Sequence, residues 1–187
     1  MYGFLKKGEG NKAVVSNKIF EIIMYEYFLS KNFASTKQIA KVLQQDIVEG
    51  GFFDMAHCLR KFKDHYAEIW NARDAEFIER EGRLLFLSYL KPLINGQGFY
   101  HIESEYTDLR RMDIVVDFGQ EQFILELKMW RGEAAHEKAY EQLLGYMDVK
   151  GALEGYLLTF DFRKDANKQP YAKWVSFGGK RIFDVVV

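Results

Sequence analysis

The spacing of apolar residues divides the chain into a mainly helical first part and a second part that mixes helices with strands. In the first part, two short strand-like runs flank a Gly-Glu-Gly-Asn turn within 2–17, and apolar residues then recur at helical spacing. Three helical patterns follow one another there, over 18–30, 35–51 and 53–70. We therefore expect residues 1–70 to form a small, mainly helical unit.

The second part begins near Asp74 with one long helical pattern that ends near Pro92. Three strand-like runs follow, another helical pattern comes next, and further strands complete the chain; these segments are 99–106, 111–118, 121–130, 132–151, 154–162, 173–178 and 180–187. The pattern predicts an α/β (α+β) domain over 71–187 in the order helix, three strands, helix, strand.

Composition and charge narrow the class of protein. Hydrophobic residues make up 48% of the 187 residues and Pro occurs only 2 times, which is typical of a packed globular protein. The net charge of −1 gives no overall basic field, so any contact with nucleic acid must be local. The lone Cys58, with no secretory signal and no long apolar run, favours a cytoplasmic protein without a membrane anchor. The four histidines show no paired spacing that favours a zinc site.

Two charged residues interrupt an apolar strand-like run. Glu126 and Lys128 lie two apart in Phe-Ile-Leu-Glu-Leu-Lys-Met-Trp, so both project to one face of the predicted strand. Asp113 lies in the preceding run, and a turn at 119–120 would pair the two runs as a hairpin with the carboxylates of Asp113 and Glu126 close together. Two nearby carboxylates are suited to Mg²⁺, and a neighbouring ammonium suits phosphodiester hydrolysis.

An acidic residue two positions before a lysine is by itself weak evidence for a catalytic site. The chain holds a second such triplet at 148–150, at a predicted helix end, where it needs no catalytic explanation. From the residues alone, a solvated strand end with a surface ion pair stays open for Asp113, Glu126 and Lys128.

Two helical positions support the site. Glu81 falls between Phe77 and Leu85 on an apolar helix face. Its carboxylate either needs a polar partner there or lies at the solvated edge of that face. Gly82, the next residue, would let the helix approach the sheet closely. Gln142 and Tyr146 share a face of the later helix and could bind a phosphate or base, or form ordinary hydrogen bonds at its border.

Together these motifs resemble the PD-(D/E)XK nuclease superfamily. Arg111-Met112-Asp113 is similar to its first metal-binding motif, residues 126–128 to its second and residues 142–146 to its Gln-xxx-Tyr variant. Met112 stands where the superfamily name has Pro, which removes no ligand. The resemblance implies a restriction-endonuclease-like αβββαβ core with a mixed central sheet flanked by helices.

The resemblance also implies site residues and a cofactor. It assigns Mg²⁺ (or Mn²⁺) to Asp113 and Glu126, with Glu81 as a direct or indirect ligand, and gives Lys128 the role of positioning water and the scissile phosphate. Arg111, Gln142 and Tyr146 would bind substrate, which is nucleic acid, with DNA preferred over RNA.

A closer similarity is to the nuclease-like C-terminal regions of bacterial AAA-ATPase-like proteins, through residues 79–100, 126–133 and 154–164. Residues 1–70 resemble the winged-helix-like linker that precedes those regions. No G-x-x-x-x-G-K-[ST] loop is present, so a separate ATPase module is the implied partner. The alternatives are a catalytically silent nuclease fold that binds nucleic acid or protein, and an assembly subunit for such an ATPase.

Overall fold

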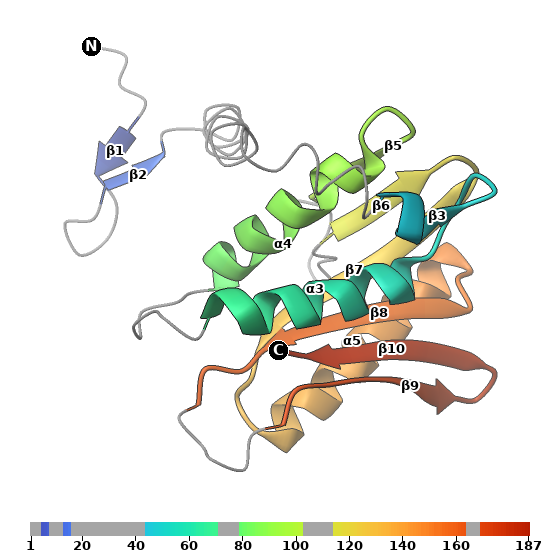
Figure 1. The fold of residues 1–187 in the computed structure, drawn as a ribbon. Coiled ribbons are helices and arrows are strands. Elements are labelled where there is room, and N and C mark those ends of the chain that lie inside the picture. The colour runs from blue at the N-terminus through green and yellow to red at the C-terminus, as the bar shows by residue number, and fades with distance from the viewer. Residues whose placement is uncertain (1–4, 8–12, 16–43, 71–78, 103–113, 164–168) are drawn as a thin grey trace.

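The computed structural model describes residues 5–7, 13–15, 44–70, 79–102, 114–163 and 169–187 (Figure 1). Its main helices and strands are, in chain order, β1 (Leu5–Lys7), β2 (Ala13–Val15), β3 (Val48–Glu49), β4 (Phe52–Phe53), α3 (Met55–Trp70), α4 (Glu79–Ile94), β5 (Gly98–His101), β6 (Ile114–Phe118), β7 (Glu121–Met129), α5 (Glu133–Lys150), β8 (Glu154–Phe160), β9 (Tyr171–Phe177) and β10 (Lys180–Val186). The fold is mixed α/β. The order helix, three strands, helix, strand is confirmed by α4, β5 to β7, α5 and β8.

Six strands form one mixed sheet in the order β5-β6-β7-β8-β10-β9. β6 and β7 are antiparallel, as the sequence predicted, and join through a turn at Gly119, whose φ of 58° suits glycine. β7 and β8 are parallel neighbours connected by α5, and β8 and β10 are also parallel. β10 lies between β8 and β9, so two strands that are consecutive in the chain are not neighbours in the sheet.

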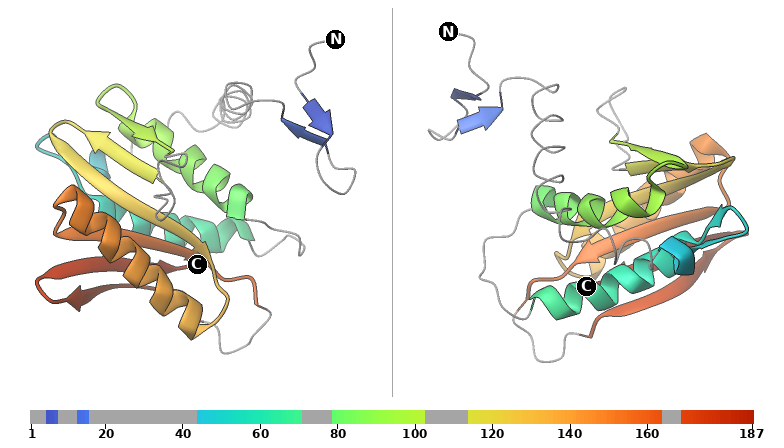
Figure 2. Two further views of the ribbon diagram at one scale, coloured as in Figure 1. Left: turned by 180° about the vertical axis from the view of Figure 1, so that it is seen from behind. Right: turned by 45° about the horizontal axis from the view of Figure 1, so that its top comes forward.

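Helices cover both faces of the sheet: α3 and α4 lie on one face and α5 on the other (Figure 2). The larger apolar core lies between the sheet and the pair α3 and α4. Its largest fully buried side chains include Phe62, Phe86 and Phe160, and the ring of Phe62 contacts each of the other two edge to face. The smaller core lies under α5 and includes Leu143 and Met147.

Gly82 allows α4 to approach the sheet closely. A Cβ atom at this position would lie 2.7 Å from Cε2 of Phe160, at the end of β8. No larger residue fits there without displacement of that ring, so the predicted role of Gly82 in helix packing is confirmed.

The first part of the chain agrees with the sequence only in part. The hairpin of β1 and β2 is confirmed, and α3 follows the pattern predicted for 53–70. The helix expected over 35–51 differs: helix ends at Ile47, and β3 and β4 form a small hairpin around Gly50 and Gly51, whose positive φ values of 60° and 86° make a tight turn. The helix predicted for 18–30 lies outside the described residues.

Residues 44–70 share the larger core with the sheet, through side chains such as Ile47, Phe53 and Leu59. The domain boundary near residue 70 stays a prediction. α4 continues to Ile94, past Pro92. Within the described ranges, no helix has the length and apolar character needed to cross a membrane.

Candidate functional site between the sheet and helix α5

Three buried polar side chains of the sheet project toward α5. Ile124, Leu157 and Ile182 pack in the smaller core under this helix. Side chains two residues further along each strand project to the same face, and these are Glu126, Thr159 and Asp184. All three are fully buried. The three central strands therefore each place one polar group under the same helix.

Glu126 and Lys128 form an ion pair on this face. Nζ of Lys128 lies 2.5 Å from Oε1 of Glu126, and the two side chains are 30% and 1% exposed. Lys128 pairs across the parallel ladder with Thr159, and Glu126 pairs with Leu157. The carboxylate is thus buried in the centre of the sheet, while the ammonium reaches the surface beside it.

A cavity of about 190 Å³ opens where β7 ends and α5 begins. Its lining residues come from the end of β7, the connection and the first turn of α5, and they are Lys128, Met129, Trp130, Arg131, Ala135 and His136. Gly132, with a φ of 101°, turns the chain between the strand and the helix. The cavity therefore combines two cationic side chains, an imidazole and an indole.

Trp130 forms a fixed wall of this cavity. Its ring lies 5.0 Å from the ring of His136, and the guanidinium of Arg163 lies 4.8 Å from the Trp130 centroid. Arg163 is held in turn by buried Asp161, whose two carboxylate oxygens accept hydrogen bonds from the guanidinium at 2.8 to 3.2 Å. The segment after β8 therefore packs against one of the residues that line the cavity.

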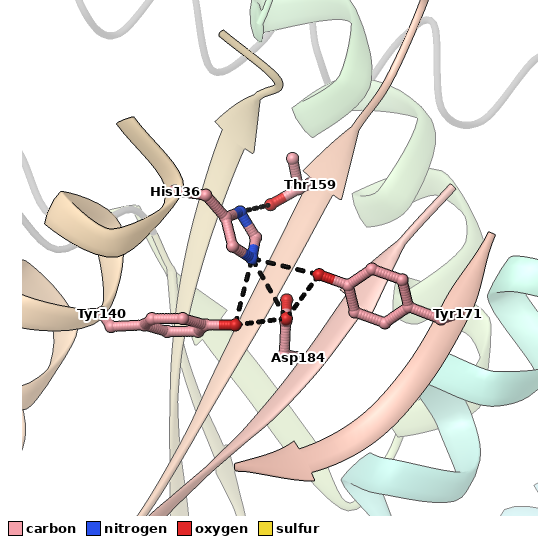
Figure 3. Close-up of polar contacts among 5 residues, drawn as sticks. All are labelled: His136, Tyr140, Thr159, Tyr171 and Asp184. Carbon is pink, nitrogen blue, oxygen red and sulfur yellow. Dashed lines mark hydrogen bonds and ion pairs between the residues drawn. The ribbon is translucent and has the colours of Figure 1, made fainter. Parts of the chain in front are cut away.

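A buried polar cluster adjoins the cavity at His136 (Figure 3). Nε2 of His136 lies 3.0 Å from Oδ2 of Asp184, and Tyr140 and Tyr171 donate hydrogen bonds to the same oxygen at 2.5 and 2.7 Å. On the other side of the ring, Nδ1 lies 3.5 Å from Oγ1 of Thr159. Residues from α5, β8, β9 and β10 thus meet around one imidazole.

Both tyrosines remain hydrogen-bond donors over the whole physiological range of pH. Burial raises the pKa of the Tyr140 phenol, and its hydrogen bond to Asp184 acts in the same direction. Tyr171 has its pKa raised by the same two causes. Oδ1 of Asp184, in contrast, has no hydrogen-bond partner in the part of the chain that the structure describes.

The residues predicted from the sequence are only partly brought together here. Glu126 and Lys128 share a face and contact each other, as predicted. Asp113 and Arg111 lie outside the described residues. Asp113 immediately precedes Ile114, the first residue of β6, which pairs with Leu125 next to Glu126.

The residues that the sequence predicted to join the site from helices lie in two different helices. Gln142 and Tyr146 lie on one face of α5, where Nε2 of Gln142 donates a 2.7 Å hydrogen bond to the Tyr146 hydroxyl, and Tyr146 is 2% exposed. Glu81 lies in α4, on the other side of the sheet from Glu126, and its side chain is not among those described. The substrate and metal roles of these three residues stay predictions.

The sequence interpretation missed the cluster around His136. Asp184 interrupts the apolar run Ile-Phe-Asp-Val-Val, which is the signal that singled out Glu126. His136 lies three and seven residues before Ala139 and Leu143, so it falls on the buried stripe of α5. Both residues could have been found by applying the rule for charged groups in apolar patterns to every element.

The described residues contain no group of three or more His, Cys, Asp or Glu side chains that could hold a metal ion. Glu126 supplies one buried carboxylate, which is the type of oxygen ligand that Mg²⁺ prefers. Asp113, the other predicted metal ligand, is not among the residues that the structure describes.

Comparison with protein families, with curated proteins and with solved structures gave no match for this chain.

Proposed function

We propose that this chain is a Mg²⁺-dependent nuclease of the PD-(D/E)XK type, which hydrolyses phosphodiester bonds in nucleic acid. The observation that carries the proposal is the buried carboxylate of Glu126 beside the partly exposed ammonium of Lys128, on the central strand of a mixed sheet and next to a cationic cavity. A buried charge is costly, and such groups concentrate where chemistry needs them.

The proposal requires β6 to continue by one residue before Ile114. The register that pairs Ile114 with Leu125 would then pair Asp113 with Glu126, and alternation would give Asp113 the face of Val115, which packs under α5. Asp113 and Glu126 would hold the metal. When bound, Mg²⁺ supplies charge stabilisation on the phosphate and a more acidic water.

The side chains around the cavity suit a phosphodiester substrate. Lys128 can orient a phosphate oxygen, and Arg131 and His136 line the same cavity. We expect Arg110, Arg111 and Lys138 also to take part in binding the nucleic acid backbone, and we expect that nucleic acid to be DNA rather than RNA. The resemblance to ATPase-associated nuclease regions extends the proposal to a separate ATPase as the partner.

The test is cleavage of single- and double-stranded DNA and RNA by the purified chain with Mg²⁺ or Mn²⁺. We expect cutting by the unmodified protein, and loss of at least about 10²-fold in rate for Asp113→Ala, Glu126→Ala and Lys128→Ala. Calorimetry separates the roles: the two carboxylate variants lose metal binding, whereas Lys128→Ala retains it. Unchanged cutting in all three variants would mean that the site lies elsewhere.

The second acidic-x-lysine triplet provides a matched control. Asp148 and Lys150 stand at the exposed end of α5, where Asp148 forms an ion pair with Lys180. The double variant Asp148→Ala, Lys150→Ala changes the same residue types at the same spacing, so its rate should stay within about twofold of the unmodified protein.

One observation favours a catalytically silent fold as the second candidate. Nζ of Lys128 lies 2.5 Å from Oε1 of Glu126, so the carboxylate has its counter-charge within the protein itself. Under this alternative the chain binds nucleic acid or protein and cuts nothing. Binding without cleavage of every substrate, with either metal, would favour it over the enzyme.

A further inference from the structure

We propose that His136 is the proton donor to the leaving oxygen in this reaction, oriented by Asp184 and the two tyrosines. The inference deepens the proposed nuclease function and rests on it. It gives a chemical role to the buried polar cluster around His136, to which none of the predicted nuclease residues with described side chains belongs (Figure 3).

The contacts orient the imidazole ring of His136 and indicate which of its nitrogens carries the hydrogen. Tyr140 and Tyr171 each donate to Oδ2 of Asp184, and Nε2 of His136 lies 3.0 Å from the same oxygen. A ring nitrogen that faces a carboxylate oxygen carries the hydrogen, because a lone pair in that position would be repelled. Nε2 is therefore the donor to Asp184, and proton exchange is left to Nδ1.

Nδ1 is weakly engaged. Its contact with Oγ1 of Thr159 measures 3.5 Å, which is longer than the usual range of hydrogen bonds. A nitrogen with no strong partner can accept a proton from solvent and pass it on. Asp184 behind the ring then balances the positive charge that the imidazole carries when both nitrogens are protonated.

His136 is also in the right place relative to the proposed site. It lines the same cavity as Lys128, and Thr159, which its Nδ1 contacts, is the ladder partner of Lys128 on the adjacent strand. The side chain is 7% exposed, and it is one of the residues that line the cavity. A phosphodiester bound against Lys128 would lie next to this ring.

The energetics of the cluster argue against a purely structural role. Asp184 is fully buried, and Oδ2 accepts every hydrogen bond while Oδ1 has no partner among the described residues. An unsatisfied buried carboxylate oxygen costs stability, and well-packed apolar side chains could connect α5 to β10 at lower cost. A group kept at such a cost is a candidate for chemistry.

The proposed step is balanced in atoms and charge. The oxygen of a water molecule forms a bond to phosphorus, and the bond from phosphorus to the leaving nucleoside oxygen breaks with its electron pair on that oxygen. Nδ1 of His136 gives its proton to this oxygen, which leaves as an alcohol. The attacking water releases one proton to solvent, and Nδ1 takes one proton from solvent before the next turnover.

The experiment compares two substrates of one sequence. In the first, the linkage that the unmodified protein cuts is an ordinary phosphodiester. In the second, sulfur replaces the leaving oxygen of that linkage, and a thiolate leaves without needing a proton. We expect His136→Gln to cut the ordinary linkage about 10²- to 10⁴-fold more slowly, and the sulfur linkage within about tenfold of the unmodified protein.

Other variants separate this role from folding and from the proposed metal site. Asp184→Asn, which keeps the shape of the side chain, should show the same selective loss, whereas Glu126→Ala and Lys128→Ala should lose both substrates. His101→Gln is the matched control, because His101 forms an exposed pair with Asp117 at 2.8 Å on the same sheet, and it should change neither rate. Circular dichroism and urea unfolding of each variant check that it folds.

The outcomes distinguish the two proposals. If the unmodified protein cuts both linkages and His136→Gln slows both equally, the nuclease stands and the proton-donor role is wrong. If the unmodified protein cuts neither linkage, the nuclease proposal fails and the role of His136 fails with it. Selective rescue by sulfur supports both.

Discussion

The two faces of the central sheet differ in what they bury. Toward α3 and α4 the sheet presents an apolar core in which aromatic rings such as Phe62 and Phe160 contact one another. Toward α5 it presents Glu126, Thr159 and Asp184 among apolar neighbours, and α5 adds His136. The same strands supply both faces, because successive side chains alternate between them.

We expect one face of the sheet to determine mainly the stability of the protein and the polar groups of the other face to determine mainly its activity. Apolar burial stabilises the fold by about 25 cal/mol per Å² of surface removed from water, whereas buried charges contribute little or cost stability. Substitutions on the α3 and α4 face should therefore change the free energy of unfolding. Substitutions of the buried polar groups on the α5 face should change activity more than stability.

The largest loss of stability should come from the core of the α3 and α4 face. Phe160 is 1% exposed and its ring contacts Phe62 and Tyr66. Phe160→Ala should lower the free energy of unfolding by about 3–5 kcal/mol, because it removes buried surface and leaves a cavity. Urea unfolding measures the change. Phe99→Ala, at a position 59% exposed, is the control and should cost less than about 0.5 kcal/mol.

A smaller loss is expected where α4 meets the sheet. Gly82→Ala places a methyl group 2.7 Å from Cε2 of Phe160, and we expect it to cost about 1–3 kcal/mol. The cost should fall when Phe160→Leu is combined with it, because the smaller side chain leaves room. Strict additivity of the two substitutions in a double-mutant cycle would show that the strain arises elsewhere.

On the α5 face, Glu126→Gln should have a small effect on stability and a large one on cleavage. The substitution removes a buried charge, and Lys128 is 30% exposed and can be solvated alone, so the free energy of unfolding should change by less than about 1 kcal/mol. Thermal or urea unfolding, measured beside the cleavage assay, checks both. Destabilisation by more than about 3 kcal/mol would identify the ion pair as structural.

The smallest effect concerns the single cysteine. Cys58 is fully buried in α3, and burial raises the pKa of its thiol, so little thiolate forms at neutral pH. The folded protein should not react with a thiol reagent on the time scale of minutes, and the protein in denaturant should react fully. Rapid labelling under native conditions would show that α3 opens away from the sheet.

The central strands and helices could be predicted from the sequence because the spacing of apolar residues and the turn residues of each segment indicate its structure directly. The apolar runs of β6 and β7, the turn at Gly119 and the helical spacing of apolar residues in α5 predicted the antiparallel hairpin and the helix that follows it. The helix predicted over 35–51 was wrong at its end, because two glycines after a helical pattern also suit the end of a helix. Here they form the turn of a hairpin instead.

Sequence reasoning identified the candidate site only where strand alternation sufficed. Glu126 and Lys128 are two apart on one strand, so their shared face follows from local geometry. The cluster around His136 joins residues up to 48 positions apart, and no local rule states that Tyr171 and Asp184 will meet the same ring. That meeting depends on β10 lying beside β8, which the order of strands along the chain does not specify.

The position of β10 between β8 and β9 has a consequence for how the chain folds. β9 and β10 form a hairpin of near neighbours that can assemble within microseconds, while the parallel pairing of β10 with β8 closes a longer loop and is slower. In the final sheet β8 pairs with β10 and not with β9, so the hairpin must dock with β10 next to β8. The contact of Asp184 with Tyr171 lies within this hairpin, whereas its contacts with His136 and Tyr140 of α5 require the hairpin to dock beside β8.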